Sequence, residues 1–152
     1  MRKYIDNNRK LIAGLIFIIY LLVLGYHLFL SDILGRREIA DSYRYNFVLF
    51  KEISRYIANI EIIGFKLVFL NIAGNIIAFV PFGIFVTYFL NDNSRVFIKT
   101  ILSGLILTIS VEGIQLFAKV GICDVDDILL NFVGVVTGAI FAKLFYKKGK
   151  ST

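Results

Sequence analysis

The sequence predicts an all-α membrane protein with four transmembrane helices. Of its 152 residues, 58% are hydrophobic and 15% are aromatic, and the mean hydropathy is +0.78. These values exceed what a water-soluble domain needs. A helix needs about 20 apolar residues to cross roughly 30 Å of hydrocarbon. The chain therefore has room for four spans, which we expect to form a single membrane domain over residues 1–152.

The first span is expected over residues 11–30, which carry no Asp, Glu, Lys or Arg. This run is longer than the roughly 7 to 15 residues of a signal-peptide core, and no small-residue cleavage site follows it. We therefore expect an uncleaved anchor.

A mixed segment follows the first span, and residues 43–60 within it predict an amphipathic helix. Its apolar residues recur at spacings of three and four, whereas charged residues occupy the other directions. The helix is too short and too charged to span, so we expect it on the membrane surface. The apolar positions are Phe47, Phe50, Ile53, Tyr56, Ile57 and Ile60.

The remaining spans are expected over residues 67–90, 96–118 and 127–146. Pro81 lies inside the second of them and removes a backbone hydrogen bond, which predicts a kink. Residues 91–95 form a polar turn, and a short loop precedes the fourth span. The basic residues concentrate in the short segments on the side of the two termini, so both termini are expected to be cytoplasmic.

The charge and the cysteine content exclude several functions. The net charge of +6 is spread between apolar runs, and no basic helix or aromatic platform suggests a nucleic-acid partner. Cys123 is the only cysteine, so no internal disulfide forms, and we expect it to be a small packing residue. His27 is the only histidine and is expected at the membrane interface. We expect no metal and no cofactor.

Polar residues gather at one depth in the last three spans. Each of these spans places a polar pair on one helix face, in the half nearer the outer surface. Since neighbouring spans are antiparallel, the pairs meet at the same depth. They are Asn71 with Asn75, Glu112 with Gln115, and Asp127 with Asn131.

Small residues continue the polar faces and predict close helix packing. Gly134 and Gly138 lie four residues apart, as do Gly74 and Ala78, and such pairs let backbones approach each other. Together with Pro81 they define the expected packing seams.

Several chemistries fit the polar residues. An acid near the bilayer centre costs about 2.5 to 3.5 kcal/mol and usually marks function, which singles out Glu112. With Asp124 and Asp127, it could bind a hard cation, act as acid and base, or carry protons. Alternatively, the amides and acids could simply bridge helices, at about 0.6 kcal/mol for each hydrogen bond.

The order of these residues resembles the VanZ-like family of small bacterial membrane proteins. The resemblance covers about residues 36–145 and rests on three motifs, with an upstream element, Arg44-Tyr-Asn46, that is also similar. Leu49 stands where the family usually has Pro. The motifs are NIAGNIIAFVPFG from Asn71, Glu112-x-x-Gln115, and Asp124-x-Asp126-Asp127-x-x-x-Asn131-x-x-Gly134-x-x-x-Gly138.

The resemblance implies a plasma-membrane protein that acts at the outer face on the cell envelope. The family is named for a teicoplanin-resistance protein, so lower susceptibility to glycopeptides is expected. The expected partners are membrane lipids and a lipid-linked cell-wall precursor or lipoglycopeptide. A transporter with only four spans would also need a second copy of the chain, joined through the Gly134 and Gly138 seam. Arginines of the outer segment could hold a phosphate or carboxylate of such an amphiphile; they are Arg36, Arg37, Arg44 and Arg55.

The common depth of the polar residues, together with the family resemblance, favours a lipid-binding protein over an enzyme. The expected site comprises Glu112, Gln115, Asp124, Asp126, Asp127 and Asn131, supported by Asn71, Asn75, Arg44 and Asn46. Two other functions remain open: an intramembrane enzyme that modifies a lipid-linked envelope substrate, and a small ion-coupled transporter.

Overall fold

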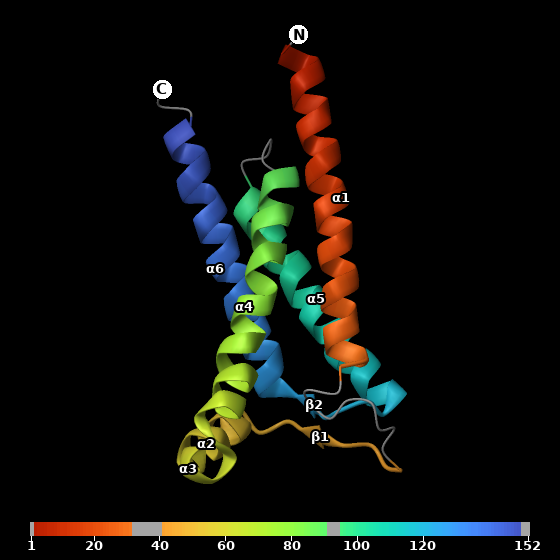
Figure 1. Ribbon diagram of the computed structural model, residues 1–152, viewed down its shortest axis with the longest axis vertical. Coiled ribbons are helices and arrows are strands. Elements are labelled where there is room, and N and C mark those ends of the chain that lie inside the picture. Colours follow the sequence, from red (N-terminus) through yellow and green to blue (C-terminus); the bar gives the residue numbers. More distant parts are fainter. Residues whose placement is uncertain (1, 32–40, 91–94, 150–152) are drawn as a thin grey trace.

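The fold is a bundle of four long helices. The computed structural model describes residues 2–31, 41–90 and 95–149. Helices α1 (Arg2–Phe29), α4 (Phe65–Phe89), α5 (Val96–Ala118) and α6 (Val125–Gly149) run up and down, and the two termini lie at the same end (Figure 1). Each of these helices contains a stretch that is long and apolar enough to cross a membrane: Asn7–Phe29, Phe65–Phe89, Val96–Ala118 and Val125–Phe145. The prediction of a multi-pass helical membrane protein is confirmed.

Helices α4 and α6 form the tightest pair because glycines remove the side chains between them. A Cβ atom on Gly134 would lie 2.2 Å from the carbonyl oxygen of Ile76, and one on Gly138 would lie 2.0 Å from that of Val80. Gly83 of α4 faces α6 in the same way. The seam is thus filled by α4 of the same chain, so the expected homodimer, which stays a prediction, would have to form through another surface.

Gly74 does not take part in this packing. A Cβ atom on Gly74 would meet nothing within 4 Å, so the prediction that it permits a close approach is wrong. The spacing of small residues identified the stripe in α4, but the contact lies farther along the helix, at Gly83. Helix α4 continues through Pro81 to Phe89.

Helix α1 packs against α4 mainly through aromatic rings and one hydrogen bond. The Phe17 ring lies 5.2 Å from that of Phe85, centre to centre, and the Tyr20 hydroxyl donates to the carbonyl oxygen of Ala78 at 2.8 Å. Leu24 and Leu28 are buried in the bundle core with Phe79 and Val135. Most other α1 side chains are exposed apolar groups, as expected for a helix that faces lipid.

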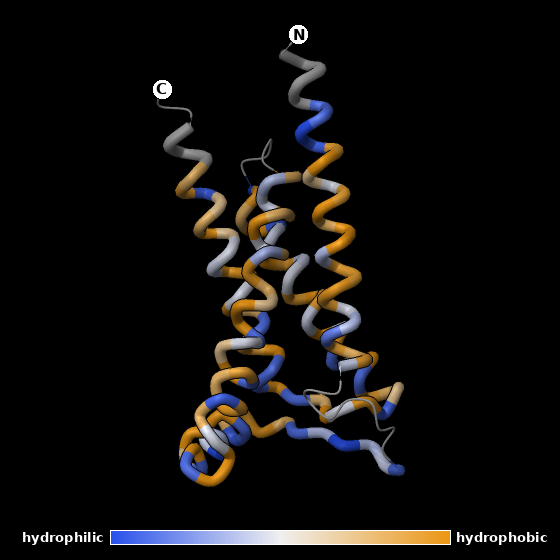
Figure 2. Tube along the Cα trace, in the orientation of Figure 1, coloured by the Kyte–Doolittle hydropathy of each residue, from blue (hydrophilic) through white to orange (hydrophobic). Residues whose placement is uncertain are grey.

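The end of the bundle opposite the termini is closed by short elements. Strand β1 (Tyr45–Asn46) pairs in parallel with β2 (Cys123–Asp124), and helices α2 (Lys51–Ala58) and α3 (Ile60–Ile63) follow β1. Figure 2 shows hydrophobic residues along the long helices and hydrophilic residues around β1. This end brings together segments that are about 80 residues apart in sequence, as the pairing of Tyr45 with Cys123 shows.

The amphipathic helix expected over residues 43–60 is only partly correct. Residues 45–46 form a strand, and the helix begins at Lys51. Phe50 has a left-handed backbone with φ of 62°, which no α-helix continues through. The helix that does form, α2, has no buried residue.

Candidate functional site

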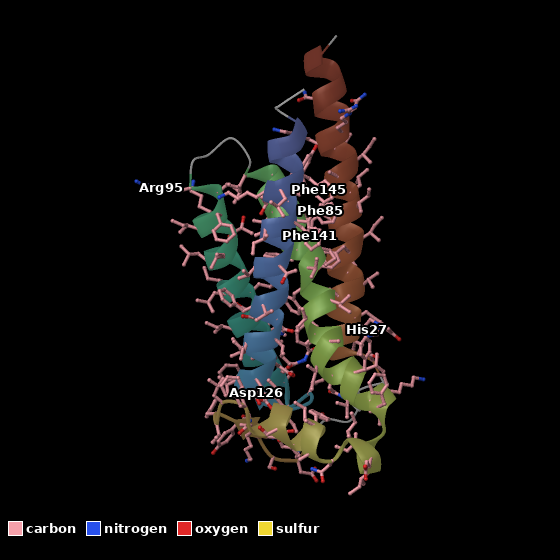
Figure 3. The ribbon with its side chains drawn as sticks, turned by 90° about the vertical axis from the view of Figure 1, so that its left-hand side faces the viewer. His27, Phe85, Arg95, Asp126, Phe141 and Phe145 are labelled. Carbon is pink, nitrogen blue, oxygen red and sulfur yellow. The ribbon has the colours of Figure 1, made fainter. Side chains whose placement is uncertain are left out.

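Polar side chains are buried where the short elements meet the ends of α5 and α6. Asp126 lies at this end of the bundle, opposite the phenylalanines Phe85, Phe141 and Phe145 (Figure 3). The buried polar residues here are Asn46, Asn75, Glu112, Gln115, Asp124, Asp126 and Asn131. At least one member of each predicted polar pair is therefore buried at this end of the bundle.

The Asp126 carboxylate caps helix α2 from another part of the chain. The N–H of Phe50 donates to Oδ1 at 2.5 Å, and the N–H groups of Glu52 and Ile53 donate to Oδ2 at 2.9 and 3.1 Å. The first residues of a helix carry N–H groups without a partner inside the helix, and they usually take an acceptor from a nearby Ser, Thr, Asp or Asn. Phe50 at the N-cap has no such group, so Asp126 supplies it.

Asp124 performs the same function for α6. Its Oδ1 accepts the N–H of Asp126 at 2.9 Å and the Nδ2–H of Asn46 at 3.1 Å. Its own N–H donates to Oε2 of Glu112 at 2.9 Å. A chain of polar contacts thus runs from α5 through the β2 strand to β1.

Asn46 and Arg44 fix the segment that leads into α2. The Asn46 side chain accepts the N–H of Val48 at 3.2 Å, and the carbonyl oxygen of Arg44 accepts the N–H of Cys123 at 3.0 Å. The Arg44 side chain is exposed. Its position beside the buried network would let it meet a ligand at the surface.

The two asparagines of α4 differ in their surroundings. Asn75 is buried and donates to Oδ1 of Asp127 on α6 at 2.7 Å. Asn71 donates to the carbonyl oxygen of Leu67 in its own helix, at an exposed position. The structure therefore brings Asn75 into the cluster and leaves Asn71 outside it.

Two amide oxygens in the cluster have no partner among the described residues. Gln115 donates its Nε2–H to the carbonyl oxygen of Leu28 at the end of α1, but its Oε1 is buried without a hydrogen bond. The same holds for Oδ1 of Asn131. These residues are 2% and 1% exposed, and an unpaired buried acceptor costs about 1–3 kcal/mol. Such an atom calls for a donor from a water molecule or a ligand.

Burial controls the charge of the loop residues. It raises the pKa of Asp124, while the hydrogen bonds from Asp126 and Asn46 act in the opposite direction. Burial also raises the pKa of the Cys123 thiol, and the nearby carboxylates of Glu112 and Asp124 add to this effect. Burial thus favours the uncharged form of both groups.

This shift predicts a pH dependence of stability. Because the pKa of Asp124 in the folded state lies above its ordinary value of about 3.9, its stabilising contribution is fully present below that value. It is lost as the pH rises through the folded pKa. The difference in melting temperature between Asp124→Asn and wild type is expected to grow in favour of the variant over this range. Thermal melts in detergent test this, and a difference that does not change with pH would contradict it.

The arginines expected to support the site do not gather around it. Arg36 and Arg37 lie outside the described residues. Arg55 bonds to Glu52 one turn earlier in α2, through Nε at 2.8 Å, and it is exposed. His27 lies on an exposed face of α1, away from Asp126 (Figure 3).

Sequence reasoning missed the role of Lys119, which ends α5. Its backbone is left-handed, with φ of 56°. Its Nζ donates to the carbonyl oxygen of Asp41 at 3.4 Å and lies 5.0 Å from the centre of the Tyr43 ring. Lys119 therefore links the two loops at this end. Its place just before Gly121 signals a helix end, but nothing local predicts its distant partners.

The family motifs coincide with this network. Residues 17–146 match the family model VanZ/LLP1. The chain belongs to the VanZ/LLP1 family. No curated protein and no solved structure matches it.

In this VanZ/LLP1 protein, the three motifs and the upstream element converge at one end of the bundle. Glu112 reaches Asp124, Asp124 reaches Asn46, and Asn75 reaches Asp127. Among the described residues, no group of three His, Cys, Asp or Glu side chains is arranged to hold a metal ion. The cluster offers hydrogen bonding by amides and carboxylates, beside the exposed cationic side chain of Arg44.

Proposed function

We propose that this protein binds a lipid or lipid-like ligand at the polar end of its bundle and thereby lowers susceptibility to glycopeptides such as teicoplanin. The observation that carries the proposal is the pair of buried amide oxygens, Gln115 Oε1 and Asn131 Oδ1, that have no partner among the described residues. They supply acceptors that the fold itself does not use.

The acids of the cluster support binding more than catalysis. The side chains of Glu112, Asp124 and Asp126 each accept at least one backbone N–H. Both oxygens of Asp126 accept backbone N–H groups of α2, so this carboxylate could take a proton from a substrate only by weakening the helix cap. This supports the amides, together with Asp127 and Asn75, as the ligand-binding groups, and it gives less support to an intramembrane enzyme or an ion-coupled transporter.

The surface around the cluster suits an amphiphile. Phe47, Phe50 and Ile57 are exposed apolar side chains of the segment that covers this end, and Arg44 is exposed between β1 and the preceding loop. A ligand could leave its tail in lipid beside the apolar residues while its head meets Arg44 and the amides. A lipid-linked cell-wall precursor and a lipoglycopeptide both have this chemistry.

The proposed orientation puts the cluster at the outer face of the plasma membrane and both termini in the cytoplasm. The short segments at the termini carry most of the basic residues, which favours the cytoplasmic side. A glycopeptide acts from outside the cell, so a ligand-binding end would have to face outward.

Replacing Asn131 by Leu tests the proposal most directly. Because Leu removes the unpaired oxygen without creating a large cavity, the variant is expected to fold with equal or higher stability. We expect it to lose protection against teicoplanin. The measurement is the minimal inhibitory concentration in a susceptible Gram-positive host, with protein levels matched by immunoblot.

Asn71→Leu is the matched control. It makes the same change on α4, at an amide that bonds only within its own helix, and it should protect as well as wild type. Full protection by Asn131→Leu would refute the binding role of that amide. A wild-type protein that gives no protection would refute the glycopeptide role.

A further inference from the structure

An apolar groove lies between α1, α4 and α6, in the half of the bundle nearer the two termini. Its volume is about 460 Å³, which falls within the roughly 300–1,000 Å³ range of small-molecule sites. Figure 3 shows Phe85, Phe141 and Phe145 on this half, away from Asp126 and the polar cluster. The groove is lined by Ala13, Phe85, Tyr88, Phe141, Ala142 and Phe145, among others.

Residue sizes explain why the space exists. Ala13 of α1 and Ala142 of α6 present only methyl groups, so α1 and α6 leave a gap over α4. Aromatic side chains form the walls, and Phe141 stacks on Phe145 with ring centres 6.5 Å apart. Rigid rings of this kind keep a groove open and offer a large apolar contact area.

The membrane determines the class of the occupant. The lining residues belong to the candidate spans of α1, α4 and α6, and the surface that they present is almost entirely apolar. An aliphatic chain fits such a lining, whereas a polar ligand would lose its hydrogen bonds to water there. The groove is open on one side, so a lipid can enter it from the bilayer.

Basic residues at the mouth of the groove select the head group. Arg9 and Lys10 precede Ala13 by four and three residues and therefore lie one turn nearer the end of α1, on the side of the helix that carries Ala13. Both side chains are exposed. Long basic side chains at a helix end extend to the interface, where they meet anionic head groups.

We propose that the groove binds one acyl chain of an anionic phospholipid whose phosphate is held by Arg9 and Lys10. The lipid comes from the leaflet on the side of the termini, so this site is separate from the proposed ligand site at the other end. The bound acyl chain would lie between α1 on one side and the paired helices α4 and α6 on the other.

A tryptophan in the groove reports its occupancy. The chain contains no Trp, so Phe141→Trp gives a single reporter on the groove wall. The protein is placed in phosphatidylcholine vesicles that contain a minor fraction of either phosphatidylglycerol or phosphatidylcholine with brominated acyl chains, which quench Trp fluorescence on contact. We expect brominated phosphatidylglycerol to quench more strongly than brominated phosphatidylcholine.

Four further variants decide the outcome. Neutralising Arg9 or Lys10 with Gln should reduce the preference for phosphatidylglycerol about fivefold each, which corresponds to about 1 kcal/mol per basic residue. Ala13→Phe should fill the groove and reduce quenching by both lipids. Leu144→Trp, on the neighbouring exposed position of α6, should show no preference. Equal quenching of Phe141→Trp by the two lipids, or a preference that survives Ala13→Phe, would overturn the proposal.

Discussion

Asp126→Asn is expected to destabilise the folded protein by about 2–4 kcal/mol, because hydrogen bonds to a charged group and helix caps each contribute on the order of 1–3 kcal/mol. The Asp126 side chain is 1% exposed, and both of its oxygens accept backbone N–H groups. An amide has only one oxygen, so its NH₂ group would face either the N–H of Phe50 or those of Glu52 and Ile53. The measurement is the melting temperature in detergent, with hydrogen exchange of the amides of residues 50–53.

Asp124→Asn is the matched control for this prediction. Asp124 receives the Asn46 and Asp126 donors on the same oxygen, and an amide oxygen can accept both. Burial also favours its uncharged form, so the variant should be at least as stable as wild type at neutral pH. Equal losses from the two substitutions, or unchanged exchange at residues 50–53 in Asp126→Asn, would show that the cap is not what holds α2.

The sequence predicted the spans well because span length depends on one physical quantity, the thickness of the bilayer. Helix α5 has the expected bounds of 96–118, and α4 begins and ends within two residues of expectation. The common depth of the polar pairs could also be predicted, since it requires only antiparallel neighbours and helical spacing.

The partners of the acids could not be predicted in the same way. The acceptors and donors around Asp126 are separated by 73 to 76 residues, and no local pattern encodes such a pairing. From the sequence, Asp126 was expected to be a site residue. In the structure its carboxylate accepts backbone N–H groups at the start of α2 and so links α6 to α2. The same bonds explain why the helix expected from residue 43 begins only at Lys51, because tertiary contacts overrode the apolar periodicity before it.

The glycine pattern also shows that local sequence spacing does not predict tertiary contacts. Small residues four apart occur at Gly74 with Ala78 and at Gly134 with Gly138, and spacing alone cannot tell which face meets a neighbouring helix. In the structure Gly134 and Gly138 lie against carbonyl oxygens of α4, whereas Gly74 faces open space. Because of this difference, replacing Gly138 and Gly74 separately by Ala tests the close packing of α4 and α6.

Gly138→Ala is expected to destabilise the bundle by about 1–3 kcal/mol, the usual cost of overpacking. The new methyl group would lie 2.0 Å from the carbonyl oxygen of Val80 and 3.0 Å from the N atom of Ile84, and backbone atoms cannot turn aside as a side chain can. Helices α4 and α6 must then separate, which weakens the contact that also aligns Asn75 with Asp127. Melting temperature in detergent measures the loss, and protection against teicoplanin should fall with it if the proposed site depends on that alignment.

Gly74→Ala makes the same chemical change where there is room for it. Ala has a higher helix propensity than Gly by about 1 kcal/mol, so this variant should be as stable as wild type or slightly more stable. The comparison separates packing from propensity, because both glycines lie inside long helices and only their neighbours differ. If Gly138→Ala proved as stable as Gly74→Ala, helices α4 and α6 could not be as close as the structure places them, and the role of the seam in positioning the polar cluster would have to be abandoned.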